Sequence, residues 1–396
     1  TAYAAVNTIR IDDLRPHIYR THDDSKTWQE IVRGIPNDEN VNVVREDPQR
    51  RGLLFAGTER GVYFSFDDGD HWQSLRLNLP ATSVRDLIVK DDDLCIGTHG
   101  RGFWILDNIT PLRQLRADAP DQTGLAEAGP SGGTSFRSSS FKTKLFKPQT
   151  ALRVRWDTNT DTPLPPDEPA GENPPEGAMI DYSLGAGESG SVTLEIKDAN
   201  GQVVRRYAST DSLPGKEEKL KIPRYWVKQP RAVSGEPGLH RFFWDMHGQP
   251  LPNAEPQYPM TAVEHETAPQ PTAPWMMPGD YTVSLTTGGQ TITQPLKLKM
   301  DPRVKASSAD LAKQFELSKK LYELRGQLMP IGKQYEALVT ALTKAKERAE
   351  KQELQAQVAA MEKKLEPFAN PEAVRSGRPL ELELLGKVTK LFGDLQ

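Results

Sequence analysis

The sequence predicts a mainly β protein with a helical C-terminal region, and three observations lead to this fold class. A Ser/Thr-x-Asp motif that ends in tryptophan occurs twice near the N-terminus. The middle of the chain alternates apolar and polar residues between turn signals, as half-buried strands do. After residue 306 the apolar residues take helical spacing. The 396 residues are enough for two or three domains.

The N-terminal repeat indicates the architecture of residues 1–116. The segment from Thr21 to Trp28 aligns with the segment from Ser65 to Trp72, and the two tryptophans lie 44 residues apart. A second repeat pairs the Gly-Thr blocks at 57–63 and 97–104, which start 40 residues apart. A period of about 40–50 residues is typical of a four-stranded propeller blade. Residues 1–116 are therefore predicted to form three blades, the first of them incomplete.

Turn signals and short apolar runs locate the strands of these blades. We expect strands at 3–6, 18–21 and 28–31, then at 41–45, 53–57, 62–66 and 72–75, and finally at 84–89, 94–97, 103–106 and 112–115. Because propellers use about 4–8 blades, residues 1–116 are not expected to close a ring alone. The remaining blades would come from the same parent protein or from another chain.

The tryptophan-terminated motif has a structural interpretation. Its aspartate and hydroxyl can bond backbone amides across a tight turn, its glycine permits positive φ, and its tryptophan packs back against the hairpin. Ser25 stands where the second motif has glycine, which weakens the turn signal of the first. The residues assigned this structural role are Asp23, Thr27, Trp28, Ser65, Asp67, Gly69 and Trp72.

These motifs resemble the Asp-box, or bacterial neuraminidase (BNR), repeat of sialidase-like and sortilin-type β-propellers. The blocks between Gly52 and Asp107 are similar to the last blades of large secreted bacterial proteins of that type. The resemblance implies an incomplete propeller ring and a secreted, periplasmic or cell-surface location in a bacterium. Many such proteins are labelled glycosyl hydrolase or sortilin-like, so the resemblance specifies the fold better than the function.

Candidate ligand-binding residues lie in the loops between the second and third strands of two blades. These loops hold Glu59 and Arg60 in one blade and His99 and Arg101 in the next. They are expected on the face opposite the Asp-box turns, where propellers usually bind ligands. An arginine pair can grip a carboxylate or phosphate bidentately, whereas the alternative is that each arginine bonds neighbouring loop carbonyls.

The leading functional hypothesis is a non-catalytic, extracytoplasmic binding or scaffold protein that presents this face to a protein or glycan. The alternative is a carbohydrate-active glycoside hydrolase. That enzyme needs two opposed carboxylates about 5–10 Å apart, and no motif in the sequence fixes such a pair. Its catalytic carboxylates would then lie mostly in upstream blades. No Walker loop or zinc-protease motif is present, so we expect no cofactor.

Charge and hydropathy exclude two classes of partner. The 50 basic and 54 acidic residues leave a net charge of -4, without the basic excess that attracts nucleic acid. The sequence contains no run of about 18 apolar residues, so no membrane span is predicted. The one cysteine, Cys95, excludes an internal disulfide and is expected in a strand core.

Residues 117–178 are rich in proline, glycine and serine and are predicted to be a linker with one short strand at 151–156. Part of this linker has the 1, 3, 5, 12 spacing of a calcium loop. Thr162 replaces the glycine that such a loop requires, so the metal candidate is weak. Its four residues are Asp157, Asn159, Asp161 and Glu168.

Residues 179–302 are predicted to form an immunoglobulin-like or fibronectin-like β-sandwich. Alternating runs at 191–197, 203–207, 238–245, 278–285 and 291–298 supply its strands. His240 and His247, seven positions apart, would face opposite sides of a strand and do not predict a metal site.

Residues 303–396 are predicted to form a helical hairpin or bundle. Apolar spacing predicts one helix from about Ser307 that ends or kinks at Pro330, a second over 335–365 and a third over 380–395. We expect an antiparallel hairpin that turns between Pro330 and Gly332 and docks on the sandwich or the propeller, because isolated helices are marginal in water.

Overall fold

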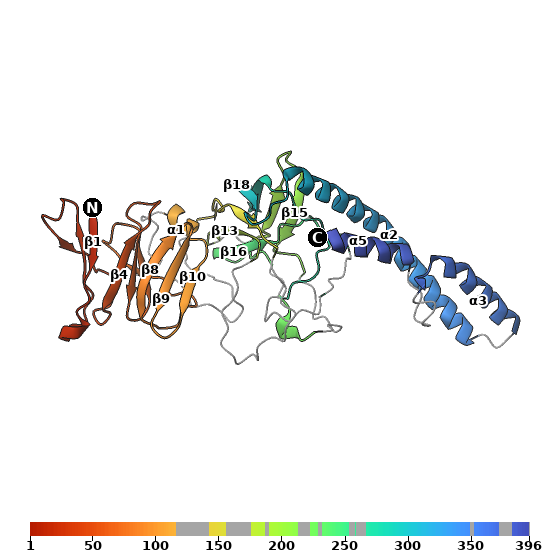
Figure 1. The fold of residues 1–396 in the computed structure, drawn as a ribbon, viewed down its shortest axis with the longest axis horizontal. Coiled ribbons are helices and arrows are strands. Elements are labelled where there is room, and N and C mark those ends of the chain that lie inside the picture. Colours follow the sequence, from red (N-terminus) through yellow and green to blue (C-terminus); the bar gives the residue numbers. More distant parts are fainter. Residues whose placement is uncertain are drawn as a thin grey trace.

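The computed structural model describes residues 1–115, 142–155, 176–186, 190–212, 222–228, 232–252, 258, 267–348, 352–371 and 382–395. The described chain is mainly β with helices at its C-terminal end. Three small sheets stand side by side, a second β region follows them, and the helices extend beyond it (Figure 1). Among the described residues, none of the helices combines the length and the apolar character that crossing a membrane requires.

Three antiparallel sheets form the N-terminal region. The first contains β1 (Ala2–Ala5), β2 (Ile18–Thr21) and β3 (Gln29–Glu30), and a short 3-10 helix, η1 (Ile9–Ile11), lies between its first two strands. The second contains β4 (Val41–Glu46), β5 (Leu54–Thr58), β6 (Val62–Ser65) and β7 (Gln73–Ser74). The third contains β8 (Val84–Lys90), β9 (Asp93–Thr98) and β10 (Phe103–Leu106).

These strands match the predicted positions with one exception. Residues 112–115 were expected to be the last strand of the third blade, but they lie in and just after the helix α1 (Thr110–Gln114). Pro111 occupies the first turn of this helix, where its fixed φ suits helical geometry and its missing N–H costs nothing. The Asn108 side chain also accepts the Thr110 N–H at 3.2 Å. These local signals outweigh the strand pattern, and β10 is left as an edge strand.

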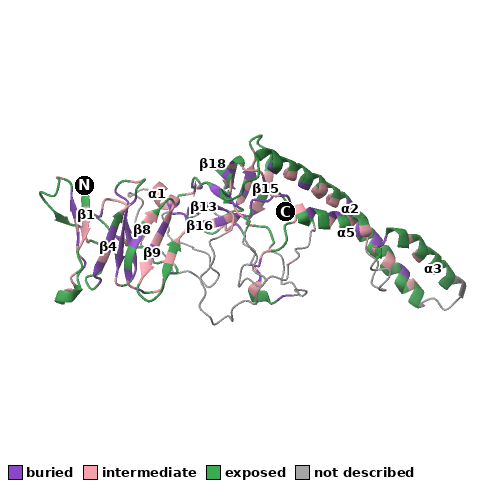
Figure 2. Ribbon diagram, in the orientation of Figure 1, coloured by how far each residue is buried: buried purple, intermediate pink, exposed green. Residues whose placement is uncertain are grey.

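Apolar side chains between the sheets hold the three sheets together, and buried residues gather there (Figure 2). The first and second sheets share a core that includes Ile18, Leu54 and Trp72. The second and third sheets share another, which includes Phe55 and Leu87. β4 lies between β1 and β8, so the first strand of each sheet is next to the first strand of its neighbour.

In the described part of the chain, the second β region contains two sheets around one apolar core. One sheet has the order β11 (Lys144–Leu145), β13 (Ala178–Leu184), β16 (Gly238–Trp244). The other has the order β12 (Ala151–Arg153), β18 (Gln290–Met300), β17 (Gly279–Thr287), β14 (Thr193–Lys197), β15 (Val203–Ala208). Tyr182, Trp244 and Leu285 belong to the shared core.

Several features of this region were not expected from the sequence. Every residue of β13 is buried, so the strand lacks the alternation by which half-buried strands are recognised. β11 lies within the segment predicted as linker and pairs with β13. β12, which pairs with β18, is the short strand expected at 151–156 within that linker. The immunoglobulin-like or fibronectin-like topology and the domain boundaries stay predictions. The calcium candidate, Asp157 to Glu168, lies outside the described residues.

The described part of the C-terminal region includes the helices α2 (Ser308–Arg348), α3 (Gln352–Leu365) and α5 (Glu383–Leu395). Two short 3-10 turns, η2 (Arg224–Trp226) and η3 (Glu366–Phe368), complete the described helical structure. α2 packs against the second β region, because Phe315 contacts its core and the Tyr322 hydroxyl donates to the Gln249 carbonyl at 2.8 Å.

The predicted hairpin turn at Pro330 is wrong. α2 continues through Pro330, and α3 packs back along α2, so that the Tyr335 hydroxyl donates to the carbonyl of Leu365, the last residue of α3, at 3.1 Å. α5 runs antiparallel along α2: the Gln314 side chain donates to the Leu395 carbonyl at 2.7 Å, and Leu385 lies against Gly332. Packing on both sides of Pro330 thus compensates for the lost backbone hydrogen bond.

Candidate functional site

The predicted ligand loops lie at one end of the second and third sheets, which we call the loop end. β6 leads from the loop at Glu59 and Arg60 to the Asp-box turn, so the turn lies at the opposite end, the turn end. The loop with His99 and Arg101 has the same position between β9 and β10. Both loops also close alike, because Thr58 and Thr98 donate their N–H groups to Gly61 and Gly102 at 2.9 and 3.1 Å.

The two predicted arginines differ in their contacts. Arg60 forms an ion pair with Asp38 at 2.8 Å, and both side chains are more than half exposed. The side chains of His99 and Arg101 are exposed and make no hydrogen bond or ion pair with any described residue. Arg101 is thus available to an anionic group, and Arg60 is held only by a solvent-exposed partner.

Glu59 connects neighbouring sheets. Its Oε1 accepts hydrogen bonds from the Asn42 amide and from the Arg85 guanidinium, both at 3.0 Å. The Asn42 amide also donates to the Val84 carbonyl at 3.1 Å, and Asn7 donates to Asn42. A polar chain from Asn7 to Arg85 therefore crosses β4 and β8 at the loop end, and Glu59 orients Arg85 within it.

Asn42 and Arg85 were not among the predicted site residues. Each lies at a register irregularity, between Val41 and Val43 in β4 and between Val84 and Asp86 in β8. A bulge of this kind turns a side chain out of the normal alternation. The only hint in the sequence is that each of these polar residues directly follows an apolar residue at the start of a strand.

The loop end therefore combines three arginines, Arg60, Arg85 and Arg101, with three carboxylates, of which the buried Glu39 accepts the Thr58 hydroxyl at 2.9 Å. Asp38 pairs with Arg60 and Glu59 pairs with Arg85. Such a surface can attract a carboxylate or phosphate group through guanidinium hydrogen bonds. Of the groups of histidine, cysteine and acidic residues within the described part of the chain, none is arranged to hold a metal ion.

The turns at 21–28 and 65–72, which were predicted to be Asp-box turns, share one hydrogen-bond pattern. In the first, the Asp23 carboxylate accepts the Thr27 N–H at 2.9 Å and the Thr27 hydroxyl at 2.7 Å, which lowers the pKa of Asp23 to about 2. In the second, Asp67 accepts the His71 N–H at 2.9 Å, and Gly69 donates its N–H to the Ser65 hydroxyl at 2.9 Å. Each aspartate serves its own turn and lies far from the loop end.

The two motif tryptophans have different surroundings. Trp72 is 3 % exposed, and its indole N–H donates to the Ile31 carbonyl of the first sheet at 2.7 Å. Trp28 is 44 % exposed, so the burial expected for it is not found. The reason is that Trp72 is covered by the segment after β3, whereas no described segment lies over the corresponding face of the first sheet.

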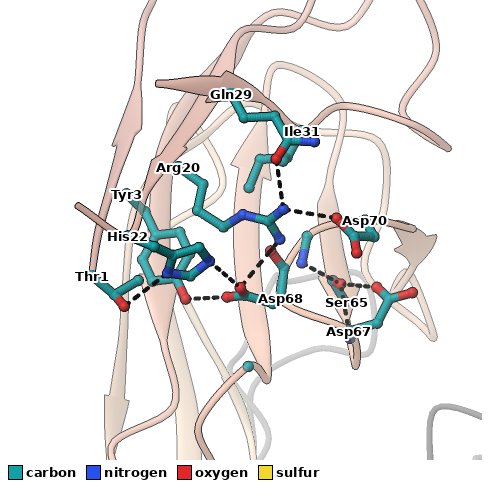
Figure 3. A network of polar contacts seen from close by, with 12 residues as sticks. Thr1, Tyr3, Arg20, His22, Gln29, Ile31, Ser65, Asp67, Asp68 and Asp70 are labelled. Carbon is teal, nitrogen blue, oxygen red and sulfur yellow. Dashed lines mark hydrogen bonds and ion pairs between the residues drawn. The ribbon is translucent and has the colours of Figure 1, made fainter. Parts of the chain in front are cut away.

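A polar network joins the first and second sheets at the turn end (Figure 3). Asp68 accepts hydrogen bonds from the Tyr3 hydroxyl, from Arg20 at 3.2 Å and from His22 at 2.9 Å. Arg20 also reaches Asp70 at 3.0 Å. Burial, and then the bond to Asp68, raises the pKa of Tyr3 well above its ordinary value. These contacts connect side chains of the two sheets, so this network is a structural joint, although the buried Arg20 Nε has no hydrogen-bond partner among the described residues.

Comparisons with known proteins do not assign the chain to a family. No protein-family model matches it, and no curated protein is significantly similar to it. Solved structures with some similarity include YCF48 bound to D1 peptide, with 13 % identity over 48 % of this chain and 46 % of that chain and a TM-score of 0.20.

Another is the extracellular domain of the hybrid two-component system BT4673 from B. thetaiotaomicron, with 10 % identity over 73 % of this chain and 29 % of that chain and a TM-score of 0.19. The extracellular domain described as the one-component system BT4673 has 11 % identity over 72 % of this chain and 33 % of that chain, with a TM-score of 0.18. This chain spans less than half the length of each of the three. Similarity at these TM-scores supports no inference about fold or function.

Proposed function

We propose that this chain is an extracytoplasmic binding or scaffold protein whose sheets are Asp-box propeller blades and whose loop end binds an anionic group on a protein or glycan. The observation that carries the proposal is the exposed Arg101, which has no partner among the described residues, on the same end as Arg60 and Arg85. The extracytoplasmic location rests on the resemblance of the two motifs to the repeats of secreted propellers.

The chemistry of the loop end favours a carboxylate or a phosphate. A guanidinium offers a planar pair of N–H donors that fits either group bidentately. The ion pair of Arg60 with Asp38 is solvent-exposed and is worth at most about 1 kcal/mol, so an incoming anion can replace Asp38 at small cost. Arg85 forms a hydrogen bond with Glu59 and adds a positive charge to the loop end.

Binding is a better match to these residues than hydrolysis. A glycoside hydrolase needs an acid and a base or nucleophile that face one sugar. Of the three carboxylates at the loop end, Asp38 and Glu59 each form an ion pair with an arginine, and the buried Glu39 accepts hydrogen bonds from the Thr58 and Tyr63 hydroxyls. The hydrolase alternative therefore gains no support from the loop end, and it depends on carboxylates from other blades.

The test is a double variant, Arg60→Ala with Arg101→Ala, measured by surface plasmon resonance against a carboxylated polysaccharide and an acidic peptide. We expect binding to be lost and the melting temperature to stay nearly unchanged, since both side chains are exposed. Arg60→Lys with Arg101→Lys keeps the charge without the planar fork and should bind weakly.

The matched control is Arg206→Ala, which removes an exposed arginine from the second β region and should leave binding intact. Unchanged affinity in the double variant would contradict the proposal. So would a large loss of stability, because it would show that the two arginines maintain the loops.

A further inference from the structure

The connection between β1 and β2 belongs to the loop end. It spans residues 6–17, includes η1, and is called the long loop here. β2 leads from it to the turn at 21–28, as β6 leads from the loop of Arg60 to the turn at 65–72. Figure 1 shows η1, the red helical turn after β1, beyond the ends of the strands. The long loop therefore projects from the same end as the arginine loops.

Hydrogen bonds order the long loop. The Val6 N–H donates to the His17 carbonyl at 3.0 Å and closes its base. The Thr8 hydroxyl donates to the Asp13 carbonyl at 2.9 Å, and the buried Asn40 amide donates to the Thr8 hydroxyl at 3.1 Å. A surface that is already ordered loses little conformational freedom when it binds a partner.

The long loop exposes a cluster of aliphatic side chains. Ile11 is 76 % exposed, Leu14 47 %, Ile9 42 % and Val6 41 %. Arg10 is exposed between two of them and makes no hydrogen bond or ion pair with any described residue. Exposed apolar residues that stand singly are ordinary, whereas several on one short loop mark an interaction site.

A series of backbone contacts joins the long loop to the arginine loops. The Asn40 carbonyl accepts the Glu59 N–H at 3.0 Å, so the residue that anchors the long loop also anchors the loop of Arg60. The segment at 82–83 then donates to the Arg60 carbonyl at 3.4 Å and accepts the His99 N–H at 2.9 Å. The three loops therefore lie next to one another in the order of their sheets.

This order places aliphatic side chains beside arginines on one surface. Branched aliphatic side chains gain most by contact with other apolar side chains. The hydroxyl groups of a glycan would lose water there without gaining a hydrogen bond. Sheets stack through their faces, whereas the long loop lies past the strand ends, so this surface is separate from the faces on which a neighbouring sheet would stack (Figure 1).

We infer that the ligand of the loop end is a polypeptide segment with apolar residues close to acidic ones. Its apolar side chains contact the long loop, and its acidic groups contact Arg60 and Arg101. The inference rests on the proposed function and adds the long loop to its site. Packed sheets lie about 10 Å apart and an extended chain advances about 3.3 Å per residue, so the acidic residues should lie about three to six positions from the apolar ones.

Surface plasmon resonance on the whole chain tests the inference with three probes. One peptide has two leucines about four positions from two aspartates, a second peptide has serines in place of the leucines, and the third probe is a carboxylated polysaccharide. The leucine peptide should bind at least about 10-fold more tightly than the serine peptide, as burial of one aliphatic side chain predicts. Ile9→Ser with Ile11→Ser should abolish this preference and leave the affinity for the serine peptide unchanged.

Matched variants separate the contact from an effect on folding. Ile11→Leu keeps an aliphatic side chain and should keep the preference. Val203→Ser alters an exposed apolar residue of the second β region and should also keep it. All of these side chains are exposed, so the melting temperatures should agree. Equal affinity for the two peptides, tighter binding of the polysaccharide, or a preference that survives the double isoleucine variant would overturn the inference.

The variant with Arg60→Ala and Arg101→Ala distinguishes this inference from the proposed function. It should lose all three probes, whereas the double isoleucine variant should lose only the preference for leucine. Loss of all probes in the arginine variant without any preference in the unmodified protein would refute the inference and leave the proposed function intact. Failure of the unmodified protein to bind any acidic probe would contradict the proposed function, and this inference with it.

Discussion

Ser25 and Gly69 occupy the same position in the two Asp-box turns and adopt the same left-handed backbone, with φ of 70° and 92°. A residue with a side chain is strained there, whereas glycine is not. We expect Ser25→Gly to raise the free energy of unfolding by about 0.5–1 kcal/mol in urea denaturation. Ser212→Gly, at an exposed serine without positive φ, is the control and should not stabilise.

The converse substitution is predicted to be harmful. A Cβ on Gly69 would lie 2.4 Å from the Ile31 Cδ1 atom, closer than van der Waals contact allows. Stabilisation by Gly69→Ala would therefore contradict this account of the turn.

The two tryptophans provide a comparison at matched positions. Trp72→Ala removes a buried ring between two sheets and should cost about 3–5 kcal/mol of unfolding free energy. Trp28→Ala removes an exposed ring and should cost under about 1 kcal/mol. Urea denaturation of both variants at the same low concentration measures the difference. Equal losses would show that Trp28 has a covering partner.

The first Asp-box turn should be sensitive to acid. The pKa of Asp23 falls from 3.8 to about 2 on folding, because the Thr27 N–H and hydroxyl bond the ionised carboxylate. The stabilisation is therefore present above pH 4 and is lost as the pH falls toward 2. Asp23→Asn removes this titration, so the melting-temperature difference between the two proteins should shrink over that range. A difference that stays constant from pH 7 to pH 2 would exclude a contribution from this carboxylate.

At the level of elements, the long helix α2 shows how packing overrides a local signal. Pro330 lacks the N–H that would bond the Gly326 carbonyl, yet the helix continues because α5 packs beside it. Pro330→Ala restores the donor and should raise the free energy of unfolding by about 1–3 kcal/mol. Pro302→Ala, at a turn outside the helix, is the control and should give no gain. Destabilisation by Pro330→Ala would show that a bend at this residue is needed for docking.

At the level of the whole molecule, one arginine couples the three sheets to the second β region. Arg241 bonds the buried Asp181 carboxylate at 2.8 Å and the carbonyls of Asp107 and Asn108, and the Asn108 amide donates to Asp181 at 2.9 Å. Arg241→Ala leaves Asp181 buried without its cation, which should cost about 3–5 kcal/mol. Calorimetry should then resolve two unfolding transitions in place of one. Arg206→Ala is the control, and two transitions already present in the unmodified protein would argue against coupling through Arg241.

Sequence patterns located most strands, because alternation and turn residues act over a few positions. The strands of the second sheet match their predicted places, and the Asp-box turns form with the expected donors and acceptors. β13 could not be recognised, since a strand buried on both faces has no alternation. Asn42 and Arg85 could not be assigned to the site, because the bulges that aim them arise from strand pairing.

The order of strands, the turn chemistry of Asp23 and Asp67 and the helical character of the C-terminal region follow from the sequence, because each depends on residues close together in the chain. What covers each surface was decided only in the tertiary structure. Trp28 and Trp72 lie in nearly identical motifs, and one is exposed while the other is buried. The burial of each tryptophan depends on a neighbouring segment from another part of the sequence. The motif itself does not indicate whether such a segment is present.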